Sequence, residues 1–211
     1  MQTGIQKAAR QGINARRRCG GKCRRRLFMS LCLSVACFAL FAILAFPPAI
    51  SSQNVIRTVN GIVVHVSDGD SMTVQTREKT KLKVRLYGID APETPKYDRK
   101  TGRMTKPGQP LGIKSKSYLS SLILQRTVQL DVVDIDSYRR MVAIVRLDDR
   151  NINLEMIRAG MAEAYVEYLK GSPYREAFLQ AEREARENRR GIWSRDQYER
   201  PRDFKRRLRV N

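Results

Sequence analysis

The clearest pattern along the chain is a strict alternation of apolar and polar residues, which is typical of a half-buried β-strand. In the stretch 81–87 the apolar positions are Leu82, Val84 and Leu86. Arg85 falls on the opposite face, which it shares with lysines. Similar signals predict five strands, at residues 62–66, 71–76, 81–87, 128–135 and 141–147.

Helical spacing of apolar residues predicts about three helices. One includes residues 118–123, a short one covers residues 154–159 with Asn153 as its N-cap, and a long one begins at Ser172-Pro173 and ends by Gly191. Two stretches lack such a pattern. Residues 95–112, rich in proline, glycine and charge, predict a long loop, and residues 200–211 predict a solvated basic tail with little structure.

The order of these elements indicates the fold class. Strands precede the helices instead of alternating with them, which argues against a doubly wound parallel sheet. We therefore expect an α+β, mainly β domain: a five-stranded Greek-key barrel of the OB-fold type, with about three helices packed against it. The expected domain covers residues 59–195, between a linker at 47–58 and a basic tail at 196–211.

The N-terminal part has a different pattern. Residues 27–46 contain no charged residue, and a helix of this length spans about 30 Å, the thickness of the hydrocarbon core of a bilayer. Residues 1–26 hold nine basic residues and no acidic one, so this leader should stay in the cytoplasm and the chain after it should be exported. The apolar segment is either an uncleaved transmembrane signal anchor or a signal peptide, and cleavage near Ala49-Ile50-Ser51 would leave a secreted or periplasmic protein.

Charge and cysteine usage narrow the function of the exported part. The 211 residues include 41 Lys and Arg and 21 Asp and Glu, a net charge of +20. Without the leader the charge is still +11, so the domain itself favours polyanions such as nucleic acid. All four cysteines precede residue 38, which excludes a disulfide or a cysteine zinc site in the rest of the chain.

Four acidic residues stand out in this basic chain. Asp68 and Asp70 lie in one predicted turn, and Asp90 and Glu93 follow the third strand. Carboxylates from separate turns can bind a hard divalent cation, although acidic residues are also common in ordinary turns. Arg85 near Asp90 and Arg140 in the last predicted turn change the balance, because paired guanidinium groups suit the charge of a reacting phosphodiester.

Five ordered motifs give the chain a family resemblance. They are VSDGDS (66–71), VRLYGIDAPET (84–94), DSYRR (136–140), NLEMIRAGMAEAYV (153–166) and RGIWS (190–194). From about Val63 to Trp193 the sequence resembles the staphylococcal nuclease, or thermonuclease, family. The arrangement of R-x-x-x-x-D-x-P-E-T together with DGD is highly specific.

The resemblance implies a metal site and its ligands. Asp70, Asp90 and the backbone carbonyl of Ala91 would bind Ca²⁺. Asp68 would support these ligands from behind or only shape its turn.

The resemblance also implies catalytic and binding residues. Glu93 would be the general base, Arg85 would bridge the scissile phosphate, and Arg140 would stabilise the developing charge and the leaving oxygen. Tyr138 and Tyr165 would line the nucleotide pocket.

The implied activity is that of an exported, monomeric endonuclease without an obligate protein partner. It would cleave the 5′ P–O bond in DNA or RNA with low sequence specificity and leave 3′-phosphate ends. An uncleaved segment 27–46 would anchor it to the membrane. The alternative is a catalytically silent OB-fold protein that binds nucleic acid at the outer face of the membrane.

The sequence departs from the family pattern at two positions. Arg139 stands where the family usually has glycine, which tolerates a positive φ better than arginine does. Glu167 occupies the place of the second pocket tyrosine, and Tyr168 comes one residue late.

Overall fold

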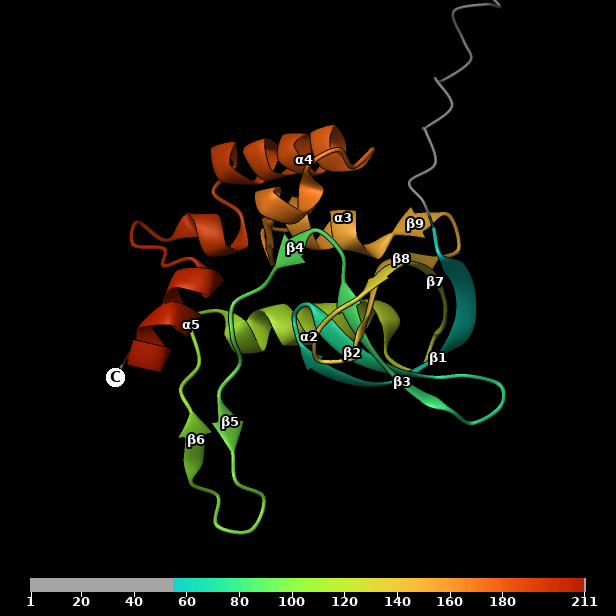
Figure 1. Cartoon of the computed structure of the whole chain (residues 1–211). Helices are drawn as coiled ribbons and strands as arrows, with labels where there is room; N and C mark the ends of the chain where they lie inside the picture. Colours follow the sequence, from blue (N-terminus) through green and yellow to red (C-terminus); the bar gives the residue numbers. More distant parts are fainter. Residues whose placement is uncertain (1–54, 211) are drawn as a thin grey trace, which may run out of the picture. The chain divides into compact units, whose positions relative to one another are not determined.

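The computed structural model describes residues 55–210 (Figure 1). The predicted leader 1–26 and the apolar segment 27–46 lie outside the described residues. Among the helices between residues 55 and 210, none combines the length and the apolar character that a membrane span needs.

Five strands form the closed barrel that the sequence predicts. They are β1 (Arg57–Asp68), β2 (Ser71–Gln75), β3 (Lys81–Leu86), β7 (Thr127–Ile135) and β8 (Met141–Leu147). Their order is β3-β2-β1-β7-β8, and a parallel pairing of β3 with β8 closes the sheet. The other pairings between these strands are antiparallel, so the arrangement fits an OB-fold. β1 begins at Arg57 and so includes the end of the predicted linker 47–58.

Alternation of side chains explains how the barrel is filled. On β2 the residues Met72 and Val74 are buried, whereas the residues between them are only half-buried. Every barrel strand contributes in this way to one core, which includes Val63, Met72, Val84, Leu130 and Ile144. Irregular register in β1, between Val63 and His65, and in β7, between Val132 and Asp134, marks bulges. Bulges bend strands and so help a small sheet to close.

Within residues 55–210, four α-helices accompany the barrel, where about three were expected: α2 (Gly112–Ile123), α3 (Ile152–Arg158), α4 (Arg175–Glu187) and α5 (Pro201–Val210). Two 3-10 helices, η1 (Val166–Leu169) and η2 (Gly191–Ser194), flank α4. Figure 1 shows α4 stacked on α3. Short strands complete the fold: β4 (Ile89–Asp90), β5 (Lys96–Tyr97), β6 (Met104–Lys106), β9 (Arg150–Asn151) and β10 (Glu163–Ala164).

Two predictions about irregular segments need correction. The predicted loop 95–112 contains the antiparallel pair β5–β6, which protrudes from the domain (Figure 1). The prediction of an unstructured tail at 200–211 was wrong, because residues 201–210 form α5. Its Phe204 is 5 % exposed, and this buried ring gives the highly charged helix an apolar contact with the domain.

The beginning of α3 also differs from expectation. Asn151, and not Asn153, caps the helix by accepting a hydrogen bond from the backbone of Leu154 at 3.1 Å. The buried Asn153 side chain instead donates to the carbonyl oxygens of Tyr87 and Ala143, at 2.9 and 3.1 Å. It therefore fixes the end of β3 against β8, directly before the segment that carries Asp90.

A charged network joins three strands on the outside of the barrel. Asp131 on β7 accepts hydrogen bonds from Thr58 on β1 (3.3 Å), from Gln129 (2.9 Å) and from the Nε atom of Arg146 on β8 (2.8 Å). Partial burial raises the pKa of Asp131, but the hydrogen bonds from Arg146 and Gln129 outweigh burial and hold the pKa below its ordinary value.

We expect Asp131→Asn to lower the free energy of unfolding at pH 7 by about 1 kcal/mol, because a charge-assisted hydrogen bond is lost. The unfolded chain takes up a proton near the ordinary pKa of 3.8, and the folded chain only at a lower pH. The stabilisation is therefore present above this range and is lost as the pH falls through the folded pKa.

Urea unfolding of both proteins between pH 7 and pH 3 measures this difference, which should shrink on acidification. Asp134→Asn is the matched control, because Asp134 lies on the same strand and is exposed. Equal effects of the two substitutions at pH 7 would contradict the assignment.

Candidate active site

The first acidic residue of the site is set by the turn between β1 and β2. Asp70 is 3 % exposed. The turn can lie this deep because of Gly69: a Cβ atom there would lie 1.9 Å from the Oγ atom of Ser115 on α2. Ser115 in turn donates to the carbonyl oxygen of Met161 at 2.6 Å. Glycine is therefore required by close packing, and the turn holds Asp70 against the barrel.

Asp90 reaches the same place from β4. This strand pairs with β10, where Glu163 is the partner of Asp90, and Asp90 is only 1 % exposed. The backbone N–H of Ala91 donates to Oδ2 of Asp70 at 3.2 Å. The structure thus brings the two predicted aspartates together at one edge of the barrel.

Arg85 joins these two carboxylates. Its Nη1 atom lies 3.1 Å from Oδ2 of Asp70, and its Nη2 atom lies 2.9 Å from Oδ1 of Asp90. The charge of Asp70 is the main reason that the pKa of Arg85 is raised. Arg85 is the second-to-last residue of β3, and the parallel pairing places it opposite Val142 of β8.

The two aspartates are not electrostatically equivalent. Burial alone would raise the pKa of Asp70, but Arg85, Lys205 and a 2.7 Å hydrogen bond from Ser71 lower it below the ordinary value. The pKa of Asp90 is raised, first by burial and then by the negative charge of Asp70. This pair therefore holds its negative charge preferentially on Asp70.

Glu93 is held by the start of the segment that leads into α2. Its backbone N–H donates to Oε1 of Gln109 at 3.2 Å, and its carbonyl oxygen accepts from the backbone of Gln109 at 2.8 Å. A Cβ atom at Gly112 would lie 2.1 Å from that carbonyl oxygen, so only glycine fits. Burial raises the pKa of Glu93, with the nearby positive charge of Lys205 acting in the opposite direction. A higher pKa makes a carboxylate a better proton acceptor.

Asp68 supports this arrangement from the end of β1. It accepts hydrogen bonds from the hydroxyl and the backbone N–H of Thr94, and from the ammonium group of Lys96 at 2.7 Å. The partners of Asp68 are thus Thr94 and Lys96, whereas Asp70 and Asp90 bind Arg85. Asp68 thus connects the DGD turn to the residues directly after Glu93.

Arg140 lies in the turn between β7 and β8. Its guanidinium group binds Asp136 at 2.7 Å and lies over the ring of Tyr138, 5.4 Å from the centroid. Asp136 also accepts the backbone N–H groups of Tyr138 and Arg140, both at 2.9 Å. Arg139 itself is exposed and has φ = 58°, a left-handed conformation that glycine tolerates better than arginine does.

A groove of about 770 Å³ brings the site residues to one surface. Arg140, Tyr138 and Tyr165 line it together with Asp70, Arg85 and Glu93. The ring of Tyr168 packs edge-on against Tyr165, with 4.7 Å between centroids, and lines the same groove. The displaced tyrosine is therefore still part of the pocket wall.

Lys205 was missed by sequence reasoning. Its Nζ atom lies 3.0 Å from Oδ1 of Asp90 and 3.0 Å from Oε1 of Glu93. The residue lies on α5, 115 positions after Asp90, in a stretch with no signal other than its charge. Phe204, next to Lys205, is buried because this stretch forms the helix α5. Only the amphipathic spacing of residues 201–210 could have indicated that helix in the sequence.

The chemistry of the site suits a hard cation. All of its anionic groups present oxygen atoms, as Ca²⁺ requires, and the Lys205 ammonium group stands in for a cation shared by Asp90 and Glu93. Across residues 55–210 there is no cluster of three or more His, Cys, Asp or Glu side chains with the geometry to hold a metal ion. Arg85 and Lys205 engage the carboxylates of Asp70, Asp90 and Glu93.

The barrel and the basic groove with its buried carboxylates define an enzyme that cleaves nucleic acids, a nuclease. Residues 83–195 match the family described as staphylococcal nuclease homologue. The chain belongs to this family, as its motifs indicated.

Relatives with nuclease names agree with this assignment. An uncharacterized endonuclease of Haemophilus influenzae is 37 % identical over 149 residues, which cover 71 % of this chain and 74 % of that protein. Endonuclease Htp3 of Saprolegnia parasitica is 33 % identical, with 71 % and 76 % covered. Micrococcal nuclease of Shigella flexneri is 32 % identical, with 74 % and 86 % covered.

We expect Arg139→Gly to leave the free energy of unfolding unchanged or to raise it by up to about 1 kcal/mol. An L-residue pays about 1–2 kcal/mol in the left-handed conformation, and the greater freedom of glycine in the unfolded chain offsets part of the gain. Urea unfolding measures the change. Arg139→Val is the comparison, because a β-branched residue is strained at φ = 58° and should lower stability. A marked loss of stability in Arg139→Gly would show that the arginine side chain supports this turn.

Proposed function

We propose that the protein is a Ca²⁺-dependent endonuclease that hydrolyses DNA and RNA with low sequence specificity and leaves 3′-phosphate ends. The observation that carries this proposal is a cluster of three carboxylates beside a groove, in which Arg85 binds Asp70 and Asp90 and Lys205 binds Asp90 and Glu93. A protein that only binds nucleic acid needs the basic groove but not this buried acidic cluster.

In this mechanism the carboxylates of Asp70 and Asp90, with the backbone carbonyl of Ala91, hold the cation. Held by these residues, a Ca²⁺ ion would supply charge to neutralise a phosphate oxygen and to orient water. The 1–3 % exposure of the two aspartates supports this role, because buried carboxylates require a compensating positive charge.

The protein's own side chains handle the proton and the phosphate charge. Glu93 accepts a proton from the attacking water, which its raised pKa favours. Arg85 binds the scissile phosphate, and Arg140 stabilises the charge that develops on phosphorus and on the leaving 5′ oxygen. The structure fits this division, since both arginines line the groove that contains Glu93.

Low sequence specificity is consistent with the groove lining. Tyr138, Tyr165 and Tyr168 offer aromatic faces or edges, and Lys106 and Arg209 offer positive charge. Stacking on aromatic rings tolerates any base, and contacts to phosphate carry no sequence information. We therefore place the nucleotide next to the scissile bond against the tyrosines.

We expect Arg85→Met and Glu93→Gln each to slow cleavage by about 100-fold or more, because each removes a group that acts in the transition state. The measurement is the rate of cleavage of denatured DNA and of RNA by the full-length chain, with Ca²⁺ and with excess chelator. Chelator should stop the parent enzyme, and the products should carry 3′-phosphates.

Lys83→Met and Glu78→Gln are the matched controls. Both residues are exposed, and the substitutions remove one positive and one negative charge, as Arg85→Met and Glu93→Gln do. They should cleave at the parent rate. If Arg85→Met cleaved as fast as Lys83→Met, the assigned mechanism would be wrong. Salt-sensitive binding by the parent without any cleavage would instead support a silent binding protein.

We further propose that the nuclease domain lies outside the cytoplasm, anchored by residues 27–46. Support comes from the uncharged run of 20 residues behind a leader with nine basic residues. Protease added to spheroplasts should digest the domain, and the mature protein should begin with the original leader. A mature N-terminus close to Ser51 would show a cleaved signal peptide, and protection from protease would contradict export.

A further inference from the structure

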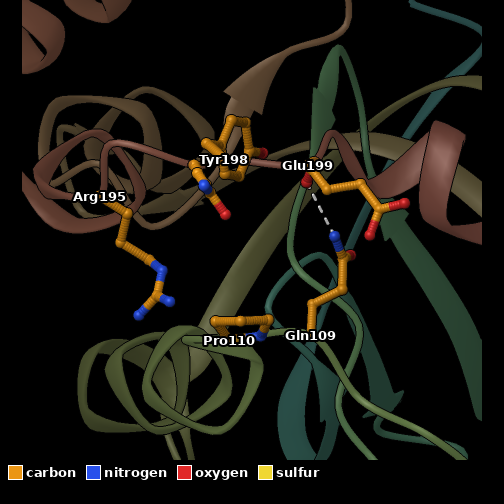
Figure 2. A pocket seen from close by; sticks show the side chains of 6 residues that line it. Gln109, Pro110, Arg195, Tyr198 and Glu199 are labelled. Atoms are coloured by element: carbon orange, nitrogen blue, oxygen red, sulfur yellow. Dashed lines mark hydrogen bonds between the residues drawn. The ribbon is translucent and has the colours of Figure 1, made fainter.

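The C-terminal segment is attached to the domain next to the active site. Arg200 binds the buried Glu163 at 3.0 Å, and the hydroxyl of Tyr198 lies 3.3 Å from the same carboxylate. Gln109 donates a hydrogen bond to the carbonyl oxygen of Glu199 at 2.8 Å (Figure 2). Both residues line a second pocket of about 390 Å³. With the buried ring of Phe204, these contacts fix α5 at both its approach and its first turn.

This attachment delivers one side chain to the reacting centre. Lys205 directly follows Phe204, and its Nζ atom is equidistant, at 3.0 Å, from oxygen atoms of Asp90 and Glu93. The other basic residues of the helix do not reach these carboxylates. Arg206 binds Asp203 at 3.2 Å with its side chain 78 % exposed, and Arg207 binds Glu199 at 2.8 Å.

The ammonium group takes oxygen atoms that a divalent cation needs. A Ca²⁺ ion binds carboxylate oxygens at about 2.3–2.6 Å. On the oxygens that Lys205 now contacts it would lie within about 5.5 Å of Nζ, where a double and a single positive charge repel strongly. The ion and the ammonium group therefore exclude each other at Asp90 and Glu93.

We propose that Lys205 competes with the divalent cation for Asp90 and Glu93, so that α5 sets the cation concentration at which the nuclease site assembles. This inference rests on the proposed Ca²⁺-dependent function. It assigns a role to a residue outside residues 83–195, the part of the chain that matches the family.

The exchange requires movement of one side chain and not of the helix. The Lys205 side chain is 32 % exposed and carries its ammonium group on four flexible methylene groups, whereas Phe204 and Glu163, the partner of Arg200, are buried. The displaced ammonium group stays in the groove, next to Arg209 and facing an incoming phosphate. Cation binding and the display of a further positive charge to substrate are thereby linked.

The test measures cation binding without nucleic acid. Full-length chains, purified in mild detergent because residues 27–46 are apolar, are titrated with Tb³⁺, whose luminescence tyrosines sensitise, and the ion is then displaced with Ca²⁺. Lys205→Met keeps the length of the side chain and removes its charge. It should lower the Kd for Ca²⁺ roughly tenfold, because a competing charge next to the ligands is gone.

Two further variants make the result specific. Arg206→Met removes the same charge one position away and should leave the Kd within about twofold of the parent, because surface charges are screened. Lys205→Arg keeps a charge at the site and should bind Ca²⁺ nearly as weakly as the parent. A Kd for Lys205→Met equal to that of Arg206→Met, or higher than that of the parent, overturns the proposal.

The outcome is distinguishable from a failure of the proposed function. If the parent binds Ca²⁺ and Asp90→Asn abolishes binding, but Lys205→Met has no effect, only the competition is wrong. If no variant binds either ion, the Ca²⁺ site itself is wrong and both proposals fall.

Discussion

The guanidinium group of Arg85 is the interaction on which the site depends. Asp70 and Asp90 lie almost fully buried and close to each other, and two such carboxylates cannot both stay ionised without compensation. Arg85 contacts both at 3.1 and 2.9 Å. Its place is fixed by the parallel pairing of β3 with β8, the same pairing that closes the barrel. The strand pairing that closes the barrel therefore also positions the guanidinium group that neutralises the acidic cluster.

A third buried acidic residue, next to Asp90, also needs a compensating positive charge. Glu163 is paired with Asp90 across β10 and β4 and is 1 % exposed, so desolvation raises its pKa to about 7 despite the positive charge of Arg200. The segment before and within α5 supplies Arg200 to Glu163 and Lys205 to Asp90. The C-terminal region thus provides two of the cations that allow this concentration of buried acid, which explains why a highly basic stretch folds onto the domain.

The sequence predicted the parts of this structure that local patterns control. Local strand signals located all five barrel strands, and the DGD and DAPE motifs located the acidic turns, because each signal lies within a few residues. The attachment of residues 198–210 depends instead on Glu163 and Gln109, which are far away in the chain and cannot be recognised as partners from the local composition. The same limit applies to Asn153, whose side chain bonds the backbone of β3 and β8 instead of capping its own helix.

The two cationic side chains that contact Asp90, Arg85 and Lys205, come from very different places in the chain. Arg85 is five residues away, comes from a barrel strand and has a side chain only 17 % exposed, so the barrel backbone holds it beside Asp90. Lys205 lies 115 residues after Asp90. Its ammonium group sits at the end of a flexible side chain that is 32 % exposed, about twice as much as that of Arg85. In the proposed competition a metal ion would replace the second contact without breaking the first. The acidic cluster would keep its geometry through Arg85 while one of its neutralising charges changed from an ammonium group to a metal ion.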